Sequence, residues 1–336
     1  MKNYKIFLVA LFVCLLPFTN LHAQMDGFIN AGPSDLKIMQ SRTLLVEIKE
    51  EDQKVEASLA KNKKDPDAVQ HYKDFITNNN SMLKKAVDKY WKFNSTVQYK
   101  TSSDLMKLVG KSDQYVIISF QGITGDNFEE TTAFDMPVII YNRSERTGKQ
   151  EPDDYMYMPP SSIPDNPNSE CWTYAQSAYD FAIIQMQANI DYMIKNNKKI
   201  RYLDYAKKIS EEKKCGELQT ETLVMDNSML DDKVDESAIK SFYKGPIELT
   251  DGKSDETFEN HVQGKEVIFS FPYGVASTSI SIATISALYS AKAIVDCKTG
   301  ELIYFYLPPS GMNMGTATTW QFKLRKYFFY YMQKCK

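Results

Sequence analysis

The sequence predicts an α/β (α+β) fold with two pseudo-repeated domains, each a mixed β-sheet with the element order β-α-β-α-β-β-β-α. Four landmarks carry this prediction, because each occurs twice and in the same order along the chain. The pairs are MQSRTLLV (39–46) with LQTETLVM (218–225), SDLMKLVGK (103–111) with SDETFENHVQGK (254–265), VIISF (116–120) with VIFSF (267–271), and YMYMPPSS (155–162) with YFYLPPSG (304–311). We therefore expect an ancient duplication.

Each copy begins with a short apolar strand, at 43–48 and at 220–225. The copies then differ. The second inserts a short helix at 236–243, whereas the first inserts a helical hairpin at about residues 50–92. Its first helix spans 50–63. Its second is expected to begin with Asp65 as N-cap and Pro66 at the first helical position, and to run to about residue 91.

The two copies agree again beyond this insertion. A strand (97–100; 247–250) precedes a short helix opened by Ser103-Asp104 or by Ser254-Asp255, and a buried strand follows (115–120; 266–271). Two further strands then form a hairpin (138–141 with 155–158; 292–296 with 302–307), and in the second copy Gly300 supplies the positive φ of the turn. A closing helix ends each copy, at 172–193 and at 318–334.

The N-terminus has the pattern of a secretory signal peptide over residues 1–23. Lys2 and Lys5 precede an apolar run at 6–18, and Ala23 stands before the cleavage site at Gln24. The apolar run is shorter than the roughly 20 residues that span a bilayer as a helix. We therefore expect an exported chain in the periplasm, on the outer-membrane surface or outside the cell, without a transmembrane segment after cleavage. The predicted domains are 24–198 and 218–336, joined by a helical linker at 199–217.

Charge and cysteine content narrow the possible partners. With 40 Lys and Arg against 43 Asp and Glu, the net charge is −3 and no basic stripe stands out, so we expect no nucleic-acid partner. The histidine and acidic residues lack metal-ligand spacing, so neither a metal nor another cofactor is expected. An exported chain with an even number of cysteines permits two disulfides with open pairing, among Cys171, Cys215, Cys297 and Cys335.

Three segments carry a resemblance to known proteins: the Ala23-Gln24 junction, LKKAVDKYWKF (83–93) and AIVDCKTGELIYFY (293–306). With these, the chain resembles a group of uncharacterised exported Bacteroidota proteins, which implies no activity. It has a fainter similarity to thioredoxin-like domains. In that comparison, Pro272-Tyr273-Gly274 follows the strand 267–271 where such enzymes place a cysteine pair, and the cysteines are absent here.

One segment is a weak candidate for ligand binding. Small and hydroxyl residues follow the buried strand 267–271 and could line a pocket for a polar ligand, namely Tyr273, Gly274, Ser277, Thr278 and Ser279. The alternative is that residues 276–289 form a small-residue helix or loop that allows close packing.

No catalytic constellation is recognisable in the sequence, so whether the protein is an enzyme stays undecided, with the balance against it. We favour a non-enzymatic exported protein with a duplicated domain that binds an unknown protein or small polar ligand, or has a structural role in the cell envelope. One alternative is a hydrolase acting on glycans or peptides through carboxylates or hydroxyls at strand ends. Another is a degenerate thioredoxin-like protein without redox activity.

Overall fold

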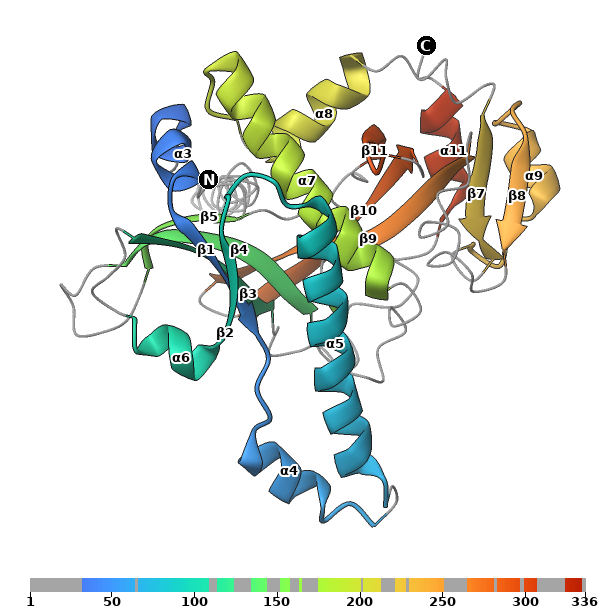
Figure 1. Cartoon of the computed structure of the whole chain (residues 1–336). Helices are drawn as coiled ribbons and strands as arrows, with labels where there is room; N and C mark the ends of the chain where they lie inside the picture. Colours follow the sequence, from blue (N-terminus) through green and yellow to red (C-terminus); the bar gives the residue numbers. More distant parts are fainter. Residues whose placement is uncertain are drawn as a thin grey trace, which may run out of the picture.

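The computed structural model combines helices with two mixed β-sheets (Figure 1). It describes residues 32–63, 66–108, 114–123, 134–143, 152–157, 163–164, 175–200, 202–212, 221–227, 230–250, 265–280, 283–296, 299–306 and 324–333. The predicted signal peptide and the candidate disulfide cysteines, Cys171, Cys215, Cys297 and Cys335, lie outside these residues. No helix within the described ranges is both long and apolar enough to cross a bilayer.

The first sheet has the strand order β2-β1-β3-β4-β5, with β6 paired to β4. Its strands are β1 (Thr43–Ile48), β2 (Val97–Thr101), β3 (Tyr115–Ile123), β4 (Phe134–Arg143), β5 (Pro152–Tyr157) and β6 (Ile163–Pro164). β1 runs parallel to both β2 and β3, whereas β3–β4 and β4–β5 are antiparallel. The prediction of a strand at 43–48 is confirmed, because this apolar, β-rich run lies at the centre of the sheet.

The second sheet has the order β8-β7-β9-β10-β11 when read in the same direction. Its strands are β7 (Thr222–Asp226), β8 (Ile247–Thr250), β9 (Lys265–Ile280), β10 (Ala283–Asp296) and β11 (Leu302–Tyr306). β7 is parallel to β8 and β9, and the remaining neighbours are antiparallel. The chain turns from β10 to β11 through Gly300, whose φ of 70° confirms the predicted positive-φ glycine.

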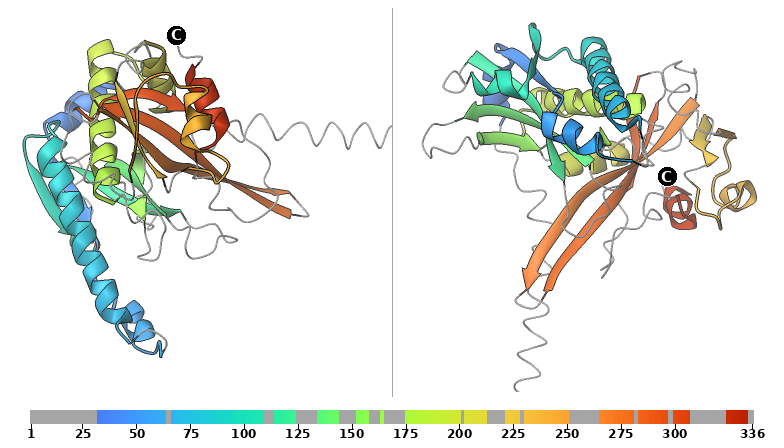
Figure 2. Two further views of the ribbon diagram at one scale, coloured as in Figure 1. Left: turned by 90° about the vertical axis from the view of Figure 1, so that its right-hand side faces the viewer. Right: turned by 90° about the horizontal axis from the view of Figure 1, so that it is seen from below.

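Residues 276–280 and 283–289, for which a small-residue helix or loop was the alternative to a ligand pocket, instead belong to two long antiparallel strands. β9 and β10 pair continuously from Ile280–Ala283 down to Glu266–Asp296, with one irregularity between Tyr289 and Ser290. Alanine and serine are compatible with a helix, but cross-strand pairing decides the conformation here. The resulting ribbon extends away from the rest of the molecule (Figure 2).

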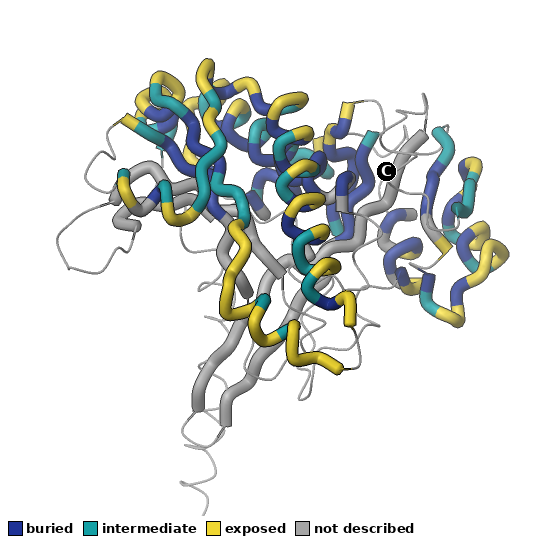
Figure 3. Tube along the Cα trace, turned by 60° about the horizontal axis from the view of Figure 1, so that its bottom comes forward, coloured by how far each residue is buried: buried dark blue, intermediate teal, exposed yellow. Residues whose placement is uncertain are grey.

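The helical hairpin of the first half is formed by α4 (Gln53–Leu59) and α5 (Ala68–Tyr90), which projects from the body as an arm (Figures 1 and 2). Its outward side is exposed along most of its length (Figure 3). Lys73 of α5 holds α4 through Glu51 (3.4 Å) and Glu56 (3.2 Å). The N-cap of α5 is Asp67 rather than the predicted Asp65, because the helical hydrogen bonds begin with His71 N–H donating to the Asp67 carbonyl.

Other helices are shorter than predicted or were not predicted. α4 is confined to 53–59, because the Asp52 side chain accepts from the Lys54 N–H and sets its start. α9 (Glu236–Lys240) and α11 (Lys326–Gln333) occupy only part of the predicted spans 236–243 and 318–334. α3 (Pro33–Gln40) was not predicted, and the remaining helices are α6 (Ser102–Met106), α7 (Ala175–Asn196) and α8 (Tyr202–Glu212).

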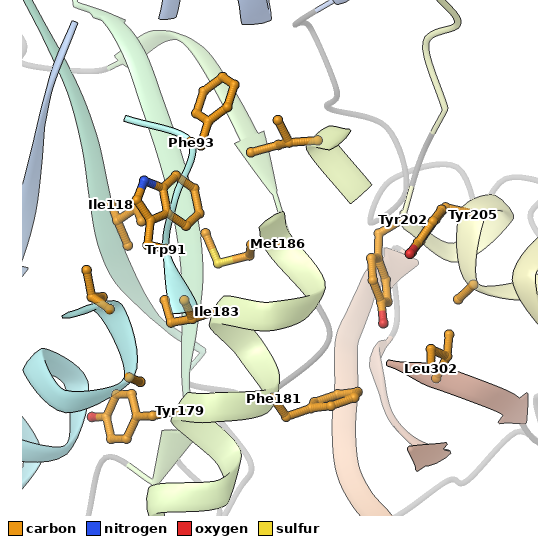
Figure 4. Packing of buried hydrophobic residues seen from close by; sticks show 14 of the residues in the cluster. Trp91, Phe93, Ile118, Tyr179, Phe181, Ile183, Met186, Tyr202, Tyr205 and Leu302 are labelled. Carbon is orange, nitrogen blue, oxygen red and sulfur yellow. The ribbon is translucent and has the colours of Figure 1, made fainter. Parts of the chain in front are cut away.

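Helix α7 lies between the two sheets and is buried on opposite sides. Tyr179 points towards α5, whereas Phe181 points towards Tyr202 of α8 and Leu302 of β11 (Figure 4). These residues belong to one hydrophobic cluster that also contains Val46 of the first sheet. A helix with apolar residues on more than one side is expected inside a core. One continuous core therefore extends from the first sheet through α7 to the second sheet.

Candidate functional site

The carboxyl ends of β1 and β2 and the middle of β3 bring acidic and hydroxyl side chains together in the first sheet. Both oxygens of the Glu47 carboxylate, at the end of β1, accept a hydrogen bond from a hydroxyl: Oε1 from Ser102 and Oε2 from Ser119. Ser102 opens α6 directly after β2, and Ser119 lies in β3. Residues 72 positions apart in the chain thus meet at one carboxylate.

A second carboxylate extends this group towards solvent. Glu50 Oε1 accepts from the Ser103 hydroxyl at 2.5 Å and from the Ser103 N–H at 3.3 Å. These bonds favour the ionised form, so the Ser103 hydroxyl first, and Thr101 next, hold the pKa of Glu50 below its ordinary value. We call Glu47, Glu50, Ser102, Ser103 and Ser119 the strand-end cluster.

The short helix α6 holds two members of the strand-end cluster in place. Its N-cap is Thr101, whose hydroxyl accepts from the Asp104 N–H at 3.3 Å and lies 3.1 Å from the Ser103 hydroxyl. Asp104 in turn binds Lys107 at 2.9 Å, which lowers the pKa of Asp104. Local capping therefore fixes Ser102 and Ser103 at the end of β2.

Accessibility changes steadily across the strand-end cluster. Ser119 is buried and Glu47 is half-buried, whereas Glu50, Ser102 and Ser103 are exposed. The strands β1 and β3 are neighbours in the sheet. The chain leaving β1 continues to β2 on one side of this pair, whereas the chain leaving β3 continues to β4 on the other side. In open α/β sheets, ligands bind outside the carboxyl ends of strands at such a switch point. The geometry therefore favours this edge of the sheet as a binding site.

The second sheet holds an unusual buried cation, Lys292 of β10. Its side chain is 4% exposed, and it lies opposite Ser270 of β9 and Tyr306 of β11. Burial, with a smaller contribution from the charge of Arg325, lowers the pKa of Lys292 from 10.5 to about 7. A lysine with a pKa near neutrality is a candidate functional group as well as a source of instability.

The residues proposed from the sequence as ligand-binding lie in the ribbon and not around a loop-lined pocket. Gly274, Ser277, Thr278 and Ser279 pair in β9 with Tyr289, Ser286, Ile285 and Thr284 of β10, and Tyr273 is the unpaired residue at the irregularity. β9 therefore continues through 272–274. The proposed likeness to a thioredoxin-like active site required the strand to end before this segment.

The strand-end cluster and Lys292 were not predicted as sites. Short apolar runs that end in a polar residue, TLLVE and VIIS, were an available signal for Glu47 and Ser119, and a lysine inside the apolar run ALYSAKAIV was one for Lys292. Among the described residues, no group of three or more His, Cys, Asp or Glu side chains gathers as metal ligands. Comparisons with protein-family models, curated proteins and solved structures find no match for this chain.

Proposed function

We propose that this chain is an exported, non-enzymatic protein of two related lobes, and that the first lobe binds a small polar ligand at the strand-end cluster. The observation that carries the proposal is the convergence of Ser102 and Ser119 on the two oxygens of Glu47, beside the carboxyl ends of the parallel strands β1 and β2. A duplicated α/β lobe accounts for the second sheet.

The duplication is supported first by the sheets. Both have the same strand order and the same strand directions. Leu44 lies opposite Val97 and Leu223 lies opposite Ile247. In each case the leucine N–H donates to the residue before the neighbouring strand, at 2.9 Å to the Thr96 carbonyl and at 3.0 Å to the Pro246 carbonyl.

Packing of the closing helices is a second argument for duplication. Leu44 and Val46 share a cluster with α7, whereas the equivalent residues Leu223 and Met225 share a cluster with α11. The last helix of each lobe thus covers the same face of its own sheet. An experimental structure in which 39–198 and 218–336 do not superpose strand for strand would remove the duplication from this proposal.

The chemistry of the strand-end cluster defines the kind of ligand. An ionised carboxylate has about four acceptor positions, and the two serine hydroxyls occupy two of those on Glu47. Each hydroxyl proton is directed at a carboxylate, so the oxygens of the exposed Ser102 and Ser103 offer acceptor positions to a ligand. A site rich in acceptors favours a ligand rich in donors, such as an amine, an amino sugar or a polyol.

The test is titration of the full exported chain with glucosamine and with spermidine, followed by calorimetry and by thermal shift. We expect at least one probe to bind, and Glu47→Gln to weaken it by about tenfold or more, because a charge-assisted hydrogen bond contributes about 1.5–3 kcal/mol. Glu56→Gln, which changes a carboxylate on α4 bound to Lys73, is the matched control and should bind like the wild type. Equal binding by Glu47→Gln would contradict the proposal.

A hydrolase is the second candidate, because the Ser102 and Ser119 hydroxyls donate to a carboxylate that could accept a proton from a nucleophile. A fluorophosphonate probe, which labels activated serines, distinguishes the two functions. Binding without catalysis predicts no labelling of either serine. Labelling that is abolished by Glu47→Gln would favour the hydrolase over the binding protein.

A further inference from the structure

The long ribbon formed by β9 and β10 reaches well beyond its own sheet. β7 pairs with β9 only from Lys265 to Val267, and β11 pairs with β10 only from Lys292 to Val295. Beyond these positions, the two strands have no strand partner other than each other among the residues that the structure describes. Figure 2 shows this part extending away from the helices and the other strands. Its two outer edges therefore carry backbone groups without a strand partner in the described part of the chain.

The sequence of this extension lacks the usual protection of an edge strand. Residues 267–291 contain no Asp, Glu, Lys, Arg or His. Charged side chains, prolines and bulges normally keep exposed edges from pairing with another chain. β9 does carry Pro272 and the irregularity next to Gly274, whereas residues 283–290 of β10 contain neither proline, glycine nor charge. Of the two edges, that of β10 is the less protected.

We propose that residues 283–290 of β10 pair edge to edge with the same residues of a second copy of this chain. Antiparallel pairing of one strand with its own copy about a two-fold axis uses a single surface patch, as most homodimers do. The absence of charge means that two copies meet without like-charge repulsion. Eight residues extend about 27 Å at ~3.4 Å per residue, which exceeds a typical strand of 5–6 residues.

The decisive experiment is sedimentation analysis of the exported full chain over the micromolar range. We expect a concentration-dependent dimer. The double variant Thr284→Lys/Ser286→Lys should weaken the dimer by at least about tenfold, because the new charges of the two copies come together across the shared edge.

The matched control is Ser277→Lys/Ser279→Lys, which places the same charges on β9 directly opposite Ser286 and Thr284. These lysines are one strand further from the shared edge, so the control should dimerise like the wild type. Circular dichroism establishes that each variant is folded.

Hydrogen exchange provides a second readout that does not depend on substitutions. Amides of residues 283–290 should become more protected as protein concentration rises, and those of 272–280 should not. A chain that stays monomeric at every concentration, or equal weakening by both lysine pairs, overturns the proposal. Binding of a monomer to phosphatidylethanolamine–phosphatidylglycerol vesicles that is lost with the β10 lysines would also overturn it, since the ribbon would then have a lipid surface as its partner.

Discussion

Replacing Lys292 by methionine should stabilise the folded protein at neutral pH. Lys292 is 4% exposed within the second sheet, between β9 and β11. Loss of hydration disfavours the ammonium form there, and the nearby charge of Arg325 adds to the effect, so the pKa falls from 10.5 to about 7. Methionine has a similar length and carries no charge.

The size of the effect follows from the difference between the folded and unfolded pKa values. A depression from 10.5 to about 7 corresponds to about 5 kcal/mol between the charged and neutral forms, at ~1.36 kcal/mol per pH unit. At pH 7 the folded group is about half protonated, so the buried lysine costs about 4 kcal/mol as an upper bound.

The sign of the pH dependence is also fixed. Between pH 7 and 10.5 the unfolded chain binds more protons at this lysine than the folded chain does, so its contribution to stability rises with pH. Below pH 7 both states are protonated and the cost stays constant. The advantage of Lys292→Met should therefore be largest at and below pH 7 and shrink as pH approaches 10.5.

Urea unfolding of wild type and variant at several pH values between 6 and 9.5 measures this difference directly. Comparing the two proteins cancels the titration of all other groups. Lys326→Met, which removes an exposed lysine at the start of α11, is the control and should change stability by under about 0.5 kcal/mol at any pH. A free-energy difference that does not vary with pH would refute the assignment of a buried lysine with a lowered pKa.

Three further expectations concern other parts of the chain. Gly300→Ala should destabilise the fold by roughly 1–3 kcal/mol in thermal or urea unfolding, because φ is 70° and a Cβ atom would lie 2.3 Å from Ile184 Cδ1; an unchanged midpoint would contradict this. Asn189 of α7 is fully buried with neither amide atom hydrogen-bonded, so Asn189→Leu should raise stability by about 1–3 kcal/mol, and destabilisation would indicate that the amide binds buried water. N-terminal sequencing of the exported protein should begin at Gln24, and an intact N-terminus would contradict the signal peptide.

Much of the fold was accessible from the sequence because local signals coincided with tertiary structure. The strand at 43–48 and the glycine turn at Gly300 were predicted where a short apolar run or a required positive φ leaves little choice. The segment 276–289 was not, because its alanine, serine and threonine residues fit several conformations. Only the pairing between β9 and β10, from Ile280–Ala283 outward, decides in favour of a ribbon.

The strand-end cluster could not be predicted from the sequence, for a different reason. Glu47 meets Ser102 and Ser119 from 55 and 72 positions away. The sequence shows a polar residue within or directly after each of these apolar runs, but the contact depends on β1 lying between β2 and β3. That order results from two crossovers, and no local pattern specifies it.

The register of β3 and β9 could not be read from the matching sequence segments of the two halves. Matching VIISF to VIFSF places Val116 with Val267, whereas the pairing places Val116 opposite Leu44 and Glu266 opposite Leu223. The alignment by sequence and the alignment by strand pairing therefore differ by one residue. A shift of one residue moves every side chain of a strand to the opposite face of the sheet. Because a strand buried on both faces is apolar at successive positions, its letters alone do not fix the register.

The central position of α7 makes the two sheets energetically dependent on each other. This helix packs against the first sheet, yet its buried Gln185 donates to the Gly300 carbonyl beside β11 of the second at 3.0 Å and accepts from the Tyr202 hydroxyl of α8. α8 lies within the predicted linker, but its Tyr202 and Tyr205 belong to the same core cluster as Val46 and Val295. Removing either sheet would expose one side of α7. We therefore expect a single cooperative unfolding transition, in which the cost of Lys292 in the second sheet also lowers the stability of the strand-end cluster in the first.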